Sequence, residues 1–248
     1  MEIMPGARRW RNARSVRVLD GPKHPVRKPS AMTTLYNRIA GQSLDRLEAL
    51  SDGLFAVAMT LLILEIRAPG HDVHTERDLW NALVDLGPRF LMYVMSFMTL
   101  GIFWTGQQTQ LNHFARADRD LAWIHIGFLA AVAVMPFSTV LLAEHITLRL
   151  ALVIYWANIL ILGLALYASL GYACRAKLLK EDVSDEIARA LQRRIVIAQA
   201  WYAVGALLCI VSTYWSIGFI VLVQLWYVVA PRIGGPWSRH KDVPKPSA

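Results

Sequence analysis

The chain has 248 residues, of which 55% are hydrophobic and only 18% are charged, and its mean hydropathy is +0.37. Soluble domains carry about 25% charged residues, so the composition argues against a soluble protein and favours a membrane protein. The formal net charge of +8 would also suit nucleic-acid binding. The basic residues flank apolar runs, however, and this placement argues against that class.

The first 30 residues differ from the rest of the chain in composition. They hold eight basic residues against two acidic ones, together with four prolines. Such a segment cannot bury a core, so we expect a basic, disordered N-terminal tail over residues 1–42. The tail could contact anionic lipid on the inner face of a membrane. A transit peptide and a true start at Met32 are the other interpretations.

Apolar runs long enough to cross a bilayer, about 17–25 residues each, recur after this tail. They are Leu50–Ile66, Pro88–Gln107, Leu121–Ala143, Leu148–Cys174, Ile195–Thr213 and Ser216–Ala230. We therefore predict an all-α, polytopic membrane protein with six transmembrane helices. The transmembrane domain would cover residues 43–231, and a C-terminal tail would cover residues 232–248.

The Lys and Arg residues are divided unevenly between the two sides of these spans. With an inner N-terminus, 22 of the 26 lie on the inner side. The outer side holds Arg67, Arg77, Arg89 and Arg149. This asymmetry follows the positive-inside rule and predicts a multi-pass protein of the cell membrane with both termini in the cytoplasm.

Two segments between the spans carry further information. The outer segment 67–87 contains Pro69, Gly70 and several charges, so we expect an exposed loop. In the inner segment 175–194, Lys177 and Glu181 have helical spacing, as do Glu186 and Arg189. The fourth and fifth helices should therefore continue beyond the lipid.

The first span has one repeating face. At ~100° per residue, residues that recur every three or four positions fall on one narrow stripe of the helix. The stripe consists of Leu50, Gly53, Val57, Thr60 and Leu64, with Leu61 beside it. A helix with such a face is a candidate for lining a passage through the membrane. Ordinary packing is the other interpretation, because residues of this size and spacing are typical of contacts between membrane helices.

The inner end of the first span carries charged residues, which are costly in a membrane helix and usually functional. Arg46 and Asp52 lie ~120° apart on the helix, so each needs a partner on another span. We predict an interhelical polar network. Its members are Arg46, Ser51, Asp52, Gln107, Gln108 and His125. A proton relay through Asp52 and His125 is the alternative.

The sequence contains no motif that favours catalysis or a resident metal. Cys174 and Cys209 lack a paired spacing, and His71 and His74 form an isolated H-x-x-H. Nucleotide-binding loops, Ser/His/Asp signatures and H-E-x-x-H are absent. We therefore expect no enzymatic activity, no cofactor and no metal other than ions in transit.

The residues of the first span resemble a known signature. Arg46-x-x-x-Leu50-Ser51-Asp52, followed by an apolar helix, is similar to the R-x-x-x-F-S-D motif of prokaryotic transmembrane-protein-175-type potassium channels. Phe103-Trp104 resembles the end of that family's second helix. The stretch from Trp123 to Thr139 resembles its third helix. The similarity extends over residues 43–230.

This resemblance implies a homotetramer of six-helix subunits, in which four copies of the first helix surround a potassium pathway. It places the constriction at Val57, with Thr60, Leu61 and Leu64 lining the path outward. It also implies that the Arg46–Ser51–Asp52 cluster holds the pore helix in place.

The chain departs from the family pattern at several positions. Leu50 replaces phenylalanine, Gln107-Gln108 stand where relatives often have two histidines, and His125 replaces asparagine. Val57 is smaller than the commoner isoleucine or leucine. The constriction should therefore be wider, and selectivity for potassium over sodium weak.

Two other functions are compatible with the sequence. A proton-coupled secondary transporter would use Asp52 and His125 as titrating groups. A non-conducting scaffold would bury the stripe of the first span against a partner helix.

Overall fold

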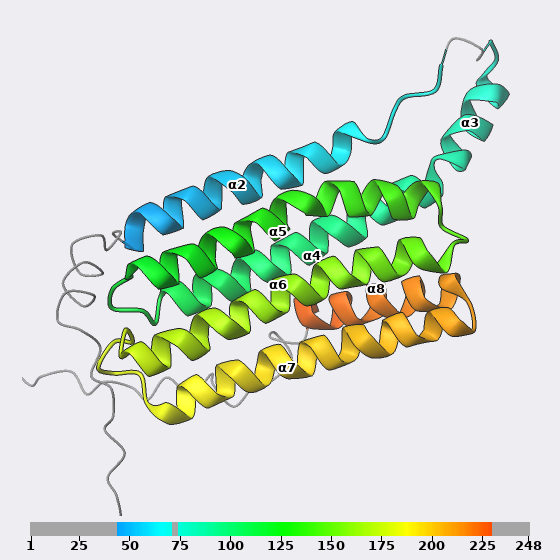
Figure 1. The fold of residues 1–248 in the computed structure, drawn as a ribbon. Helices are drawn as coiled ribbons and strands as arrows, with labels where there is room; N and C mark the ends of the chain where they lie inside the picture. The colour runs from blue at the N-terminus through cyan, green and yellow to red at the C-terminus, as the bar shows by residue number, and fades with distance from the viewer. Residues whose placement is uncertain (1–43, 71–73, 230–248) are drawn as a thin grey trace, which may run out of the picture.

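The computed structural model describes residues 44–70 and 74–229, which are almost entirely helical (Figure 1). The elements are α2 (Leu44–Leu64), α3 (Glu76–Asp85), α4 (Gly87–Leu111), α5 (Arg119–Glu144), α6 (Arg149–Ala176), α7 (Asp185–Leu207), the 3-10 turn η1 (Leu208–Ile210) and α8 (Thr213–Val229). The tails predicted over residues 1–42 and 232–248 lie outside the described residues.

The six predicted spans correspond to α2, α4, α5, α6, α7 and α8, which confirms the all-α polytopic architecture. The first five of these helices are long and apolar enough to cross a membrane, whereas α8 is a shorter apolar helix. Its 17 residues lie at the lower end of the spanning range. The chain is thus a multi-pass membrane protein.

The start of α7 agrees with the expectation, and the end of α6 does not. α7 begins at Asp185, where the Ser184 hydroxyl caps it by accepting from the Ile187 backbone N–H at 3.3 Å. It therefore includes Glu186 and Arg189, as predicted. α6, by contrast, ends at Ala176, because Lys177 adopts a left-handed conformation with φ 55°. The predicted helical pair of Lys177 and Glu181 is therefore wrong.

The segment 67–87, which was predicted to be an outer loop, contains a helix, α3. Thr75 and Asp78 form a capping box: the Asp78 backbone N–H donates to Thr75 Oγ1 at 3.2 Å, and the Thr75 N–H donates to Asp78 Oδ2 at 3.1 Å. No residue of α3 is buried. Figure 1 shows α3 projecting from one end of the bundle. The segment is exposed, as expected, but it is not irregular.

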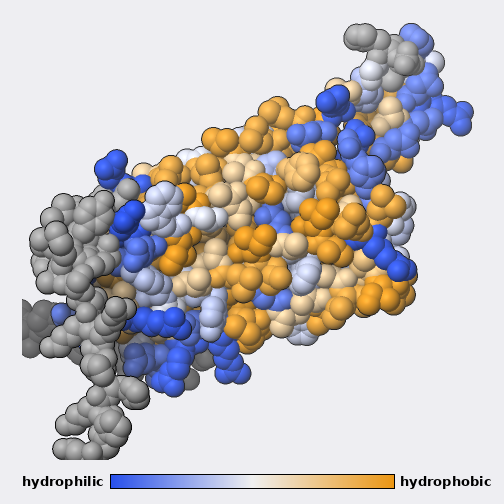
Figure 2. All heavy atoms as spheres, viewed as in Figure 1, coloured by the Kyte–Doolittle hydropathy of each residue, from blue (hydrophilic) through white to orange (hydrophobic). Residues whose placement is uncertain are grey.

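The long helices lie side by side, with α2 and α7 at opposite edges of the bundle (Figure 1). α2 packs against α4 and α5, and α6 packs between α5 and α7. Figure 2 shows apolar residues over the middle of the molecule and hydrophilic ones toward its ends. This banding suits a bundle that crosses a bilayer.

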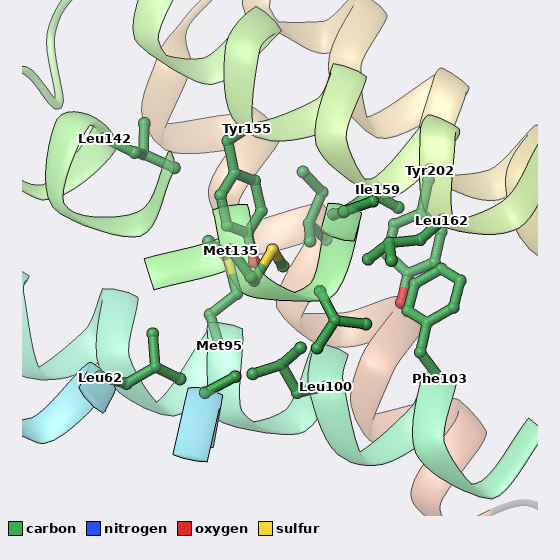
Figure 3. Close-up of a cluster of buried hydrophobic side chains, with 14 of the residues drawn as sticks. Leu62, Met95, Leu100, Phe103, Met135, Leu142, Tyr155, Ile159, Leu162 and Tyr202 are labelled. Carbon is green, nitrogen blue, oxygen red and sulfur yellow. The ribbon is translucent and has the colours of Figure 1, made fainter. Parts of the chain in front are cut away.

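The core of the bundle is apolar but surrounds a group of hydroxyls and an amide. Figure 3 shows Met95, Met135 and Tyr155 meeting at its centre. The Tyr155 hydroxyl lies 3.2 Å from Ser96 Oγ and 3.1 Å from Thr99 Oγ1. Gln224 Nε2 donates to Thr99 Oγ1 at 2.6 Å. These bonds attach α8 to α4 and α6 through buried polar groups.

Two turns at the end of the bundle where α2 begins pair with each other through backbone hydrogen bonds. The Ala115 N–H donates to the Leu178 carbonyl at 2.8 Å, and the Lys180 N–H donates to the His113 carbonyl at 3.0 Å. The α4–α5 turn and the α6–α7 turn are thereby joined.

Candidate functional site

The α2 helix has two faces with different surroundings. One face is buried where α2 packs against α4 and α5. Its buried residues are Leu47, Ser51, Phe55, Ala58 and Leu62. These positions recur every three or four residues, which is the spacing of one face of a helix. Phe55 packs against Phe128 of α5 with ring centroids 6.0 Å apart.

The other face carries the stripe predicted from the sequence. Val57 is 54% exposed, Leu61 43% and Leu64 69% in the isolated subunit. Thr60 is also exposed, and its hydroxyl donates to the carbonyls of Ala56 and Val57 at 2.9 Å each. The stripe is therefore not used to pack α2 against its own subunit.

A buried trio of polar side chains fixes the N-terminal half of α2. Ser51, Gln107 and His125 come from α2, α4 and α5 and are 0%, 1% and 4% exposed. Gln107 Nε2 donates to Ser51 Oγ at 2.8 Å, and Ser51 Oγ lies 2.6 Å from His125 Nε2. Ser51 Oγ also lies 2.7 Å from the Leu47 carbonyl. Buried polar groups are costly unless they are paired, so this trio selects one position for α2 against its two neighbours.

A second polar cluster lies at the adjoining, more exposed position. Asp52 Oδ1 accepts from Trp104 Nε1 at 2.8 Å and from Gln108 Nε2 at 2.7 Å. Both donors come from α4. Hydrogen bonds to an ionised carboxylate are short and strong, so this cluster also stabilises the contact between α2 and α4.

The predicted network is thus divided into two clusters, and Arg46 belongs to neither. Arg46 is exposed and makes no hydrogen bond or ion pair with any described residue. Trp104 is the member that was not predicted. The sequence does contain a feature that could have predicted its role. The spacing of Trp104 and Gln108 places both side chains on one face of a helix, so a partner of one can also reach the other.

α2 thus presents the uncharged stripe on one face, while hydrogen bonds on its other side hold it against α4 and α5. The Glu65 carboxylate lies exposed beyond the C-terminal end of the stripe, whereas Asp52 belongs to the side of α2 that contacts α4. Among the described residues, no group of three or more His, Cys, Asp or Glu side chains could hold a metal ion.

These features define a polytopic helical membrane protein whose first described helix keeps one face free of its own subunit. The family described as "Endosomal/lysosomal potassium channel TMEM175" matches residues 46–136. A potassium channel of Streptomyces collinus is 33% identical over 187 residues, covering 73% of this chain and 90% of that protein. The chain belongs to the TMEM175 family.

Other relatives show how far the similarity extends. The crystal structure of a lysosomal potassium-selective channel TMEM175 homolog from Chamaesiphon minutus superposes with a TM-score of 0.67 and 26% identity. The alignment covers 76% of this chain and 98% of that one. The human endosomal/lysosomal proton channel TMEM175 is 37% identical over 102 residues, which is 39% of this chain and 20% of that protein.

Proposed function

We propose that this protein is the subunit of a homotetrameric potassium channel of the cell membrane, with both termini in the cytoplasm. Four copies of α2 would surround the ion pathway. Val57 would form the constriction, and Thr60, Leu61 and Leu64 would line the path toward the outside. The observation that carries this proposal is the exposed stripe on a helix whose opposite face is fixed by buried hydrogen bonds.

The selectivity mechanism follows from the chemistry of the stripe. A cation must shed or deform its hydration shell to pass an apolar ring, and such a ring can also close by dewetting. Potassium holds its water less tightly than sodium, so the ring favours potassium. Val57 offers less bulk than a longer aliphatic side chain, and we therefore expect weak discrimination against sodium.

The two polar clusters would act as positioning elements for the constriction. The trio of Ser51, Gln107 and His125 and the Asp52 cluster hold the inner half of α2 against α4 and α5. A change in the rotation of α2 would move Val57 around the pore axis. Neither cluster needs to contact an ion to influence conduction.

The proposal is tested by measuring potassium and sodium permeation through purified protein in planar bilayers. Val57→Ala should widen the constriction and reduce the potassium-to-sodium permeability ratio by severalfold. Val196→Ala is the matched control, since Val196 is 53% exposed but lies on α7, at the opposite edge of the bundle from α2 (Figure 1). Unchanged reversal potentials for Val57→Ala would refute the constriction.

A proton-coupled transporter that uses Asp52 and His125 is the other candidate. These residues have different hydrogen-bond partners in the structure, which supports two positioning clusters rather than one relay. The same bilayer recordings separate the two functions. A channel gives unitary current steps, whereas saturable flux that is stimulated by counter-substrate would support the transporter.

A further inference from the structure

A basic cavity lies between α7 and α8 at the inner end of the bundle. It has a volume of about 530 Å³ and is lined by Arg189, Arg193 and Arg194 of α7, with Tyr227 of α8 beside them. Glu186 is the one carboxylate in its lining. The cavity therefore carries a net positive charge.

The arginines that line this cavity retain free hydrogen-bonding capacity. Arg189 uses its Nε–H to donate to the Asp185 carbonyl at 3.1 Å. Arg193 and Arg194 are exposed and make no ion pair with another residue in the described part of the chain. Guanidinium groups present donors in a planar fork that fits the oxygens of a phosphate.

The basic cavity continues into an apolar groove. The groove has a volume of about 390 Å³ and shares Ile197 and Tyr227 with the basic cavity. Its other walls are Trp201, Phe219, Leu222, Val223 and Trp226. The rings of Trp201 and Phe219 contact each other at a tilt of 41°, with centroids 6.1 Å apart, and Trp226 is 71% exposed. A cationic end and an aromatic, apolar channel thus lie next to each other along one pair of helices.

We propose that this site binds an anionic phospholipid from the leaflet at that end of the bundle, which is the inner one in the proposed orientation. The phosphate would lie between Arg193 and Arg194, with Arg189 at the margin. One acyl chain would follow the groove past Ile197 and Trp201. A phospholipid is favoured over a soluble phosphate because only a lipid satisfies the charged cavity and the apolar groove together. The proposal does not depend on conduction.

Native mass spectrometry of the full-length protein in detergent tests this site. The probes are dioleoyl phosphatidylglycerol and dioleoyl phosphatidylcholine, each titrated in turn. Basic residues near a membrane surface contribute about fivefold each to anionic-lipid binding. The double variant R193Q/R194Q should therefore bind phosphatidylglycerol roughly 10- to 30-fold more weakly.

Two variants provide the controls. R116Q/R175Q removes the same charge from exposed residues at the same end of the bundle that do not line the cavity, and it should leave binding unchanged. R193K/R194K keeps the charge but loses the planar fork, so it should retain part of the affinity. Matching size-exclusion profiles would establish that each variant is folded.

Three outcomes would overturn the proposal. Equal retention of the two lipids by the wild-type protein would show that the site does not select charge, and this comparison needs no variant. Equal loss in R193Q/R194Q and R116Q/R175Q would show a diffuse effect of surface charge. Displacement of phosphatidylglycerol by 10-fold excess inorganic phosphate would show an anion site that does not use the groove. If a second copy of the chain covered the groove, the wild-type protein would retain the two lipids equally, which is the first of these outcomes.

Discussion

Ser51 is the residue through which three helices meet. Its side chain is fully buried, and its hydroxyl oxygen lies within hydrogen-bonding distance of Gln107 on α4 and His125 on α5. Leaving the side chain of any of these residues without a hydrogen-bond partner in an apolar interior would reduce the stability of the fold. The position of the exposed stripe on α2 is therefore set by polar contacts on the opposite side of the same helix.

Two adjacent glutamines allow this view to be tested. Gln107→Leu removes a buried donor from Ser51 and should lower the free energy of unfolding by about 1–3 kcal/mol. Gln108→Leu is the control, since Gln108 is only partly buried and Asp52 keeps its bond to Trp104. The measurement is the unfolding midpoint of the purified protein in detergent. Equal losses in the two variants would contradict the distinction between the buried and the exposed cluster.

At the scale of residues, the sequence indicates which polar groups exist but not how they pair. Helical spacing places Ser51 and Asp52 on neighbouring positions of one helix, and the cost of burying charge predicts partners for them. The choice between Gln107 and Gln108 depends on the rotation of α4 relative to α2, which is a property of the packed bundle. Arg46 illustrates the same limit, because its predicted role requires a partner that the described subunit does not provide.

At the scale of elements, α8 depends on close contact with α7. A Cβ atom at Gly205 would lie 2.8 Å from Ile220 Cγ1 and 3.2 Å from Phe219 Cδ1. Ser216 Oγ donates to the Gly205 carbonyl at 2.5 Å. Small residues let membrane helices approach closely, and here the approach sets where the side chains of α8 lie.

Replacing Gly205 with alanine should therefore separate the two helices. We expect a loss of about 1–3 kcal/mol from overpacking, measured as a lower midpoint of thermal unfolding in detergent. Gly218→Ala is the matched control on α8, because its Cβ would meet no atom within 4 Å. It should be neutral or slightly stabilising, since alanine favours a helix over glycine. A Gly205→Ala variant as stable as Gly218→Ala would show that the contact is not tight.

Elements with long apolar runs were predictable, and those without them were not. The six membrane helices follow from length and hydropathy alone. α3 was missed because its ten residues, ERDLWNALVD, mix charged and apolar groups. Its T-x-x-D start is a recognisable capping signal. The inner end of α6 was misplaced because spacing between charged pairs does not reveal a left-handed terminus such as Lys177.

At the scale of the whole molecule, the proposed pore requires an arrangement that a single subunit does not supply. Four copies around an axis would place the outer ends of the stripes near one another. Side chains on the outer ends of other helices would remain farther apart. This difference can be measured without any assay of conduction.

Cysteine cross-linking provides that measurement. In a background in which Cys174 and Cys209 are replaced by serine, Leu64→Cys should form a disulfide-linked dimer under mild oxidation in membranes. Leu150→Cys is the control: both leucines are 69% exposed and lie at the outer ends of their helices, but Leu150 belongs to α6. Dimers from both variants, or from neither, would be incompatible with the proposed axis.

The backbone pairing of the two inner turns has a mechanical consequence. Ala115 with Leu178, and Lys180 with His113, fasten four consecutive helices to a common base. α2 is attached to that assembly by side-chain contacts and, at its outer end, by the segment that leads to α3. In any rearrangement of this subunit, we expect α4 to α7 to move together as one rigid unit. We expect α2 to shift or rotate relative to that unit.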